Sequence, residues 1–272
     1  MKRNISFGLI FLLGLLIYLY PTISNWLATK THYSKISEYD ATVKSLEQKE
    51  IERKKKEAKT YNNKVQNIGQ IFSDPFNETK DNSKSDYIDM LNIGETIGYI
   101  EVPKINIQLP IYQGTSEEVL SRGIGQLSES SLPVGGESTH TVLTGHRGLP
   151  SALMFTHLDK LEKNDIFYIH SLDTILAYKV DQIKEVLPNE TTDLLIVKGQ
   201  DYATLITCTP YGVNTHRLLV RGHRIPYDKQ AKAMIQKASL KEGWIISIPI
   251  IILISIIMYI YFKRKKETKI YE

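Results

Sequence analysis

The sequence predicts a mainly β domain, a sandwich or a closed barrel, that follows a helical stalk and lies between two membrane segments. Three observations support this. Long uncharged apolar stretches lie near both ends of the 272-residue chain, and an amphipathic helical pattern follows the first stretch. From residue 94 to residue 228, short runs of β-branched and aromatic residues are separated by Gly, Pro and Asn. This spacing is typical of all-β folds and not of βαβ units.

The first apolar stretch, residues 4–27, carries no charge and can cross a hydrocarbon core of about 30 Å. We predict a retained membrane anchor. The alternative is a cleaved signal peptide, but no A-x-A-like site follows the stretch, and its apolar run is long for such a peptide. The second stretch, residues 244–262, is bracketed by Trp244 and Phe262, aromatic residues of the interfacial type. Its Pro249 is compatible with a membrane helix.

The charge distribution predicts the orientation of both segments. The net charge of +4 comes from basic residues at the chain ends, in residues 1–3 and in the tail 263–272. The positive-inside rule places both termini in the cytoplasm and residues 28–243 on the extracellular face. Because the region between the segments is not basic, we predict no nucleic-acid partner.

Residues 28–68 are predicted to form the helical stalk. In residues 33–61, apolar residues recur at intervals of three and four, namely Ile36, Tyr39, Val43 and Leu46. This apolar seam fails at Glu50. The charge run 52–57 is predicted to be a solvated helix face, with binding of anionic lipid or a wall polymer as the alternative. Residues 69–93 are rich in polar and turn-forming residues, with Asp74-Pro75 as a breaker, and are predicted to be a loop.

The β domain is predicted to span residues 94–228, and residues 229–243 are predicted to link it to the second membrane segment. Short helical turns are expected at 117–122 and 151–153. Eight strands are expected, at 97–101, 107–112, 139–144, 166–169, 175–180, 182–186, 203–208 and 217–221.

Cys208 is the only cysteine, which excludes an intramolecular disulfide and a multi-cysteine metal site. It ends an apolar strand and precedes a Pro-Tyr-Gly loop. A small buried hydrophobe is the alternative interpretation of such a residue. Its place at a strand end, where a barrel rim would expose it, makes Cys208 our candidate nucleophile.

His146 and Arg217 are the candidate partners of Cys208. His146 follows another apolar strand and is flanked by glycines that would let a substrate backbone approach closely. Arg217 opens the strand after the 209–216 loop. A thiol needs a base or a cation to become a thiolate, and acyl transfer needs donors for the oxyanion. These three residues meet those needs, so we predict no metal and no cofactor. His216, beside Arg217, is the reserve candidate for the histidine.

Four motifs in this order resemble those of the sortases, the cysteine transpeptidases of Gram-positive cell surfaces. They are LPVGG at 132–136, LTGHR at 143–147, LEKND at 161–165 and LITC at 205–208, with Arg217 nine positions after Cys208. The resemblance covers roughly residues 95–225. It implies a closed eight-stranded β-barrel with the Cys, His and Arg at one rim.

Three features resemble class C, the pilin-polymerising sortases. The tripeptide Asp74-Pro75-Phe76 is similar to the lid of that class, in which an aspartate and an aromatic residue cover the active site. Taken alone, Asp-Pro-Phe is ordinary turn chemistry. The loop 209–217 and the second membrane segment also resemble class C.

The resemblance implies cleavage of an LPxTG-like sorting signal between Thr and Gly through a thioacyl enzyme. It further implies pilin or surface-protein substrates, with a lysine amine of the next pilin as acceptor. Two alternatives remain open. A sortase of another class would attach surface proteins to peptidoglycan through a cell-wall precursor. A non-enzymatic, membrane-tethered barrel that binds wall components would leave Cys208 buried and unreactive.

Overall fold

The computed structural model describes residues 2–68, 72–76, 91 and 93–234. The chain divides into two compact units, Met1–Tyr227 and Asp228–Glu272. The first unit contains every helix and strand named below. In the second, the carboxylate of Asp228 accepts hydrogen bonds from the backbone N–H groups of Gln230 and Ala231 at the start of a helical turn.

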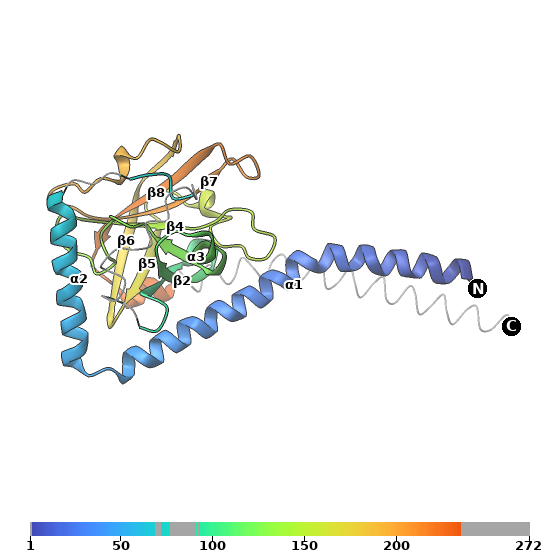
Figure 1. Cartoon of the computed structure of the whole chain (residues 1–272), viewed down its shortest axis with the longest axis horizontal. Helices are drawn as coiled ribbons and strands as arrows, with labels where there is room; N and C mark the ends of the chain where they lie inside the picture. The colour runs from blue at the N-terminus through green and yellow to red at the C-terminus, as the bar shows by residue number, and fades with distance from the viewer. Residues whose placement is uncertain (1, 69–71, 77–90, 92, 235–272) are drawn as a thin grey trace. The chain divides into compact units, whose positions relative to one another are not determined.

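A closed barrel of eight strands forms the body of the first unit (Figure 1), in the order β1-β2-β3-β4-β7-β8-β6-β5. The pairs β2–β3 and β4–β7 are parallel, and the other neighbours are antiparallel. The prediction of a closed barrel is therefore confirmed. The strands are β1 (Gly98–Val102), β2 (Ile107–Gln113), β3 (Ile124–Gln126), β4 (Thr139–Thr144), β5 (Ile166–Ser171), β6 (Thr174–Val186), β7 (Asp201–Thr209) and β8 (His216–Ile225).

The predicted number of strands is correct because two errors cancel. The strands predicted at 175–180 and 182–186 are one strand, β6, whose pairing with β8 shifts between Val180 and Gln182. A bulge keeps a strand continuous while it interrupts the alternation of side chains. β3 has only three residues and contains Gly125, so no strand was predicted there.

The short helical elements agree only in part with the sequence. The predicted turn 117–122 is the helix α3 (Glu117–Arg122), which Ser116 caps by accepting a hydrogen bond from the Val119 backbone N–H. The turn predicted at 151–153 is wrong, since the 3₁₀ turn of this connection lies at η2 (Leu158–Lys160). Two further 3₁₀ turns are η1 (Pro103–Ile105) and η3 (Thr192–Leu194).

Two helices, α1 (Lys2–Ser45) and α2 (Gln48–Ile68), stand where the sequence predicted a single amphipathic helix at 33–61. The apolar seam of α1 is buried as predicted, at Ile36, Tyr39 and Val43. The seam ends near Glu50 because the chain turns between Ser45 and Gln48. α2 then continues with a new apolar face, formed by Ile51, Ala58 and Val65.

Both helices pack against the barrel, so they do not form a free stalk. The hydroxyl of Tyr39 accepts a hydrogen bond from the Leu172 backbone N–H at 2.7 Å. On α2, the side chain of Asn62 accepts from the Leu132 N–H at 2.7 Å and donates to the Leu132 carbonyl at 3.1 Å. Figure 1 shows α2 beside the barrel.

Across the part of the chain that the structure describes, we find no helix that combines the length and the apolar character needed to span a membrane. Residues 4–27, where the sequence predicted a membrane anchor, fall within α1. The segment predicted at residues 244–262 lies outside the described residues.

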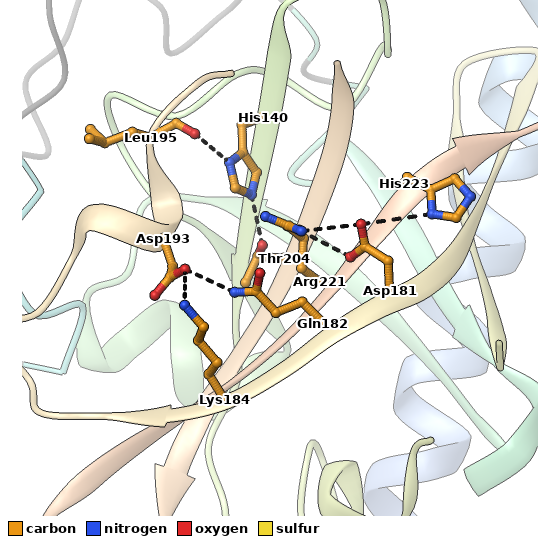
Figure 2. A network of polar contacts seen from close by, with 9 residues as sticks. All are labelled: His140, Asp181, Gln182, Lys184, Asp193, Leu195, Thr204, Arg221 and His223. Atoms are coloured by element: carbon orange, nitrogen blue, oxygen red, sulfur yellow. Dashed lines mark hydrogen bonds and ion pairs between the residues drawn. The ribbon is translucent and has the colours of Figure 1, made fainter. Parts of the chain in front are cut away.

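A polar network holds the connection between β6 and β7 to the barrel wall (Figure 2). His140 of β4 is fully buried, and burial lowers its pKa to about 4. Its ring is therefore neutral. Nδ1 donates to the Leu195 carbonyl at 3.0 Å, and Nε2 accepts from the Thr204 hydroxyl at 2.7 Å.

Two carboxylates complete this network. Asp193 accepts hydrogen bonds from Gln182 at 2.9 Å and from Lys184 at 2.7 Å, which ties η3 to β6. Figure 2 shows Asp181 between Arg221 and His223, and Arg221 Nε lies 3.0 Å from Asp181 Oδ1.

Candidate active site

Cys208 lies near the end of β7, directly opposite Arg217 of β8 in the antiparallel register. Its residue surface is 7% exposed. Burial raises the pKa of the Cys208 thiol, the charge of Arg217 opposes this rise, and the charge of Asp74 adds to it. The charge of Arg147 also lowers this pKa. Arg217 and Arg147 therefore favour the thiolate, whereas burial and the Asp74 carboxylate disfavour it.

His146 follows β4, the parallel neighbour of β7. The register pairs Thr144 with Ile206. Continued two residues further, this register brings His146 level with Cys208. The hydroxyl of Thr207 donates to the Gly145 carbonyl at 2.8 Å and fixes the backbone just before His146. The fold therefore brings the ends of three strands, with Cys208, His146 and Arg217, to one rim of the barrel.

The glycines that flank His146 are needed for packing. A Cβ at Gly145 would lie 2.6 Å from the side chain of Ile124 and 2.8 Å from Phe155, so only glycine fits. Gly148 has a φ of +83°, and the ring of Tyr211 lies 3.1 Å from the place of its absent Cβ. Side chains of this chain therefore lie where a Cβ would project at both positions, and the close approach of a substrate backbone stays a prediction.

Asp74 binds Arg217 through two hydrogen bonds. Arg217 Nε donates to one carboxylate oxygen at 2.8 Å, and Nη2 donates to the other at 2.6 Å. The third guanidinium nitrogen, Nη1, donates to the carbonyls of Asn214 and His216. Both ionic side chains are largely buried, with 10% exposure for Arg217 and 14% for Asp74. A bidentate pair of this kind is both strong and directional.

Phe76 covers the same rim. Its ring lies 5.7 Å from the ring of His146 and 5.0 Å from the guanidinium carbon of Arg217, measured to the ring centroid. It also packs against an apolar cluster that includes Phe72 and Ile206. The Asp74 carboxylate accepts from the Phe76 N–H at 3.4 Å, which closes the turn through the buried Pro75. Asp74 therefore contacts Arg217, and Phe76 contacts both Arg217 and His146.

The reserve candidate, His216, lies at the start of β8 and pairs in register with Thr209. Its Nδ1 lies 2.9 Å from the hydroxyl of Thr215. Phe76 contacts the ring of His146, which favours His146 over His216 as the histidine of this site.

Sequence reasoning missed two polar residues at the rim. Glu117, the first residue of α3, has a carboxylate oxygen 3.3 Å from His146 Nε2, an ion pair whenever the imidazole is protonated. Arg147 reaches the backbone beside Cys208. The sequence signal for Arg147 was its position next to His146. For Glu117 there was no local signal, because a tertiary contact brings α3 to β4.

A buried thiol, an imidazole and a guanidinium at one barrel rim are the groups of a cysteine acyltransferase. The comparisons with known proteins agree with this class. The Sortase domain family matches residues 100–225. Sortase A of Staphylococcus aureus is 30% identical over 198 residues, which cover 72% of this chain and 80% of that protein. The chain belongs to the sortase family.

Solved structures give a more specific likeness. The Sortase C structure of Streptococcus pneumoniae is 50% identical, has a TM-score of 0.67, and is matched over 71% of this chain and 97% of that one. A pilus-related Sortase C of Group B Streptococcus is 51% identical, with a TM-score of 0.66 and 70% and 97% coverage. The neighbours at this level of identity are thus sortases of class C.

Proposed function

We propose that this sortase is a class C enzyme that builds pili. It cleaves an LPxTG-like sorting signal between Thr and Gly and joins the released carbonyl to a lysine amine of the next pilin. The observation that carries this proposal is the Asp74-Pro75-Phe76 segment, which lies on Arg217 and His146 at the barrel rim. The Sortase C structures of Streptococcus pneumoniae and Group B Streptococcus, described in terms of pilin specificity and pili, support it.

In the first half of the reaction, the Cys208 thiolate attacks the carbonyl carbon of the signal threonine. Arg217 donates hydrogen bonds to the oxyanion or the substrate backbone. The C–N bond to glycine breaks, and His146, as imidazolium, gives its proton to the departing amine. The products are a thioacyl enzyme, a free glycine amine and a neutral His146.

In the second half, the lysine amine attacks the thioester carbonyl. Neutral His146 takes the proton of the attacking amine, the C–S bond breaks, and Cys208 leaves as thiolate. An isopeptide bond joins the two pilins, and both catalytic side chains return to their starting protonation states. Glu117 lies beside the histidine that carries charge in the first half.

The Asp74-Pro75-Phe76 segment acts as a lid. While Asp74 occupies two donors of Arg217, that guanidinium is not available to a substrate. The lid must therefore open before the sorting signal binds, and the apparent affinity falls by the fraction of molecules that are open.

We propose that the enzyme acts on the extracellular face of the membrane, with both termini in the cytoplasm. The support is the sequence itself, in the uncharged stretches 4–27 and 244–262 and the basic residues outside them. Tethering would raise the effective concentration of the enzyme for substrates that emerge from the same membrane.

Incubation with an LPxTG peptide library tests this function. We expect a thioacyl adduct on Cys208 by mass spectrometry and no adduct or product with Cys208→Ala. Replacing the small thiol with a methyl group removes little packing. The thermal unfolding midpoint of Cys208→Ala should therefore remain close to that of the parent. Joining of purified pilin subunits by the Cys208→Ala variant would disprove the role of the thiol.

Two further outcomes would replace the proposal. Cells that lack the enzyme should accumulate unpolymerised pilin, whereas the release of monomeric surface proteins would indicate attachment to peptidoglycan instead. Small thiol reagents should label Cys208 in the folded Asp74→Ala/Phe76→Ala variant. If none does, a wall-binding barrel without enzymatic activity is favoured.

A further inference from the structure

Arg147, the residue after His146, has a buried side chain that reaches the strand that carries Cys208. This side chain is 8% exposed. Its Nη1 donates to the Thr209 hydroxyl at 3.1 Å and lies 3.5 Å from the Cys208 carbonyl oxygen. Its Nη2 lies 2.8 Å from the Asp159 carboxylate. The Arg147 guanidinium thus contacts the carbonyl of Cys208 and the side chain of Thr209, the two residues that the Cys208–Thr209 peptide bond joins.

The contacts of Arg147 continue into β6. The Thr209 hydroxyl accepts from Arg147 and donates its own proton to Glu185 of β6 at 3.2 Å. A chain of polar groups therefore runs from Asp159 of η2 through Arg147 and Thr209 to Glu185. It joins three elements, η2, β7 and β6, through the loop that follows β4.

The position of Arg147 matters because the β4–β7 ladder ends before it reaches the reacting groups. The last paired residues are Thr144 and Ile206, two residues before Cys208 in β7. Beyond this pair, the guanidinium of Arg147 crosses from the end of β4 to the end of β7.

We propose that Arg147 is a positioning residue, which sets the separation of His146 and Cys208 by holding the Cys208–Thr209 peptide, and does not contact the substrate. This inference rests on the roles proposed above for Cys208 and His146. Arginine suits this task because its planar fork binds acceptors in two directions at once, here Thr209 and Asp159. A lysine has one charged nitrogen and would hold them less firmly.

Proximity explains why such a contact affects the rate. Attack and proton transfer require their groups in near-attack geometry, and a displacement of about 1 Å can cost about 100-fold in rate. The charge of Arg147 also opposes the rise in the Cys208 pKa, so the thiolate gains from the same side chain. Loss of geometry lowers kcat, whereas a contact with bound substrate would change KM.

The test compares Arg147→Met, Arg147→Lys, Thr209→Val and Thr209→Ser in the full chain, purified in detergent. All four are made in the Asp74→Ala/Phe76→Ala background, so that lid opening does not limit the rates. The probe is a fluorogenic LPxTG peptide.

We expect Arg147→Met to lower kcat by about tenfold or more and to leave KM within about twofold. Arg147→Lys should recover part of the loss. Thr209→Val should lower kcat about threefold, and Thr209→Ser should restore it.

Arg221→Met is the matched control, because Arg221 also binds an aspartate through two nitrogens, at 3.0 and 3.2 Å, but on the barrel wall. Arg221→Met should destabilise the fold and leave the kcat of the folded protein unchanged. Equal falls in kcat for Arg147→Met and Arg221→Met would overturn the inference, as would a change confined to KM. If Arg147→Met does not fold, parent-like kcat in Thr209→Val overturns it. Activity in Cys208→Ala would instead disprove the proposed function.

Discussion

At the scale of single residues, the Cys208 thiol lies near two groups of opposite charge that also bind each other, Arg217 and Asp74. A thiol is charged when deprotonated, so the Asp74 anion raises its pKa and the Arg217 cation lowers it. Replacing Asp74 with Asn, which has a similar shape, should therefore lower the pKa of Cys208. The pH at which alkylation by iodoacetamide is half-maximal should fall. Asp193→Asn, in the network around β6, should not change it, and a higher midpoint in Asp74→Asn would contradict this reasoning.

The acid–base role is testable by comparing two histidines. His146→Ala should reduce peptide cleavage by about a hundredfold or more, because a general acid–base contributes about 10²–10⁴ in rate. His216→Ala should keep most of the activity. For the parent enzyme we expect a bell-shaped pH profile of kcat/KM, since the reaction needs a thiolate and an imidazolium in the same molecule. The reverse result for the two variants would move the role to His216.

His140 makes stability depend on pH. Burial lowers its folded-state pKa from 6.5 to about 4, so the folded protein resists protonation that the unfolded chain accepts. The contribution of His140 to the free energy of unfolding is complete above its unfolded-state pKa of 6.5 and is lost as the pH falls toward 4. Between about pH 7 and pH 5, we expect urea unfolding to show a loss of about 2 kcal/mol. His140→Asn should flatten this slope.

At the scale of elements, the segment 72–76 lies against Arg217 and His146, and we expect it to control access to the rim. Asp74→Ala together with Phe76→Ala should remove the ion pair with Arg217 and the ring over His146. We expect faster alkylation of Cys208 and faster peptide hydrolysis, by about tenfold, which corresponds to about 1.4 kcal/mol of closure free energy. Ser73→Ala, in the same segment but exposed, is the control. Unchanged labelling in the double variant would leave the segment as a connector and would weaken the assignment to class C.

Elements with regular side-chain patterns were predictable from the sequence, and irregular ones were not. β4 lies at Thr139–Thr144 as predicted, because its apolar run is bounded by turn residues. β3 was missed because a three-residue strand with a central glycine has almost no pattern. The break between α1 and α2 was visible only as the loss of the seam at Glu50.

The candidate site was predictable where its residues sit at strand ends. Cys208, His146 and Arg217 each adjoin an apolar strand, so a barrel brings them to a rim. The two hydrogen bonds between Asp74 and Arg217 agree with the lid that the sortase resemblance implies, in which an aspartate covers the active site. Glu117 and Arg147 were not found, since the contact of α3 with His146 and the contact of Arg147 with the end of β7 are tertiary and leave no local pattern.

At the scale of the whole unit, α1 and α2 are part of the folded body. The family match begins at residue 100, after both helices. Yet Tyr39 and Ala58 belong to the same buried cluster as the barrel residues Ile100 and Leu205. Each helix also makes a buried hydrogen bond to the barrel, through Tyr39 and Asn62. We therefore expect the helices to contribute to the stability of the barrel.

Asn62 provides the test of this coupling. It is 2% exposed, and Asn62→Ala would leave the buried Leu132 N–H without its acceptor, while the Leu132 carbonyl keeps the Thr141 hydroxyl at 3.4 Å. A buried unsatisfied donor costs about 1–3 kcal/mol, so we expect a loss of about 2 kcal/mol in urea unfolding. Because barrel and helices form one body, intrinsic fluorescence and far-UV circular dichroism should report the same transition. The exposed neighbour Asn63→Ala should stay within about 0.5 kcal/mol of the parent. Separate transitions for the helices and the barrel, or equal effects at both positions, would show that α2 does not stabilise the barrel.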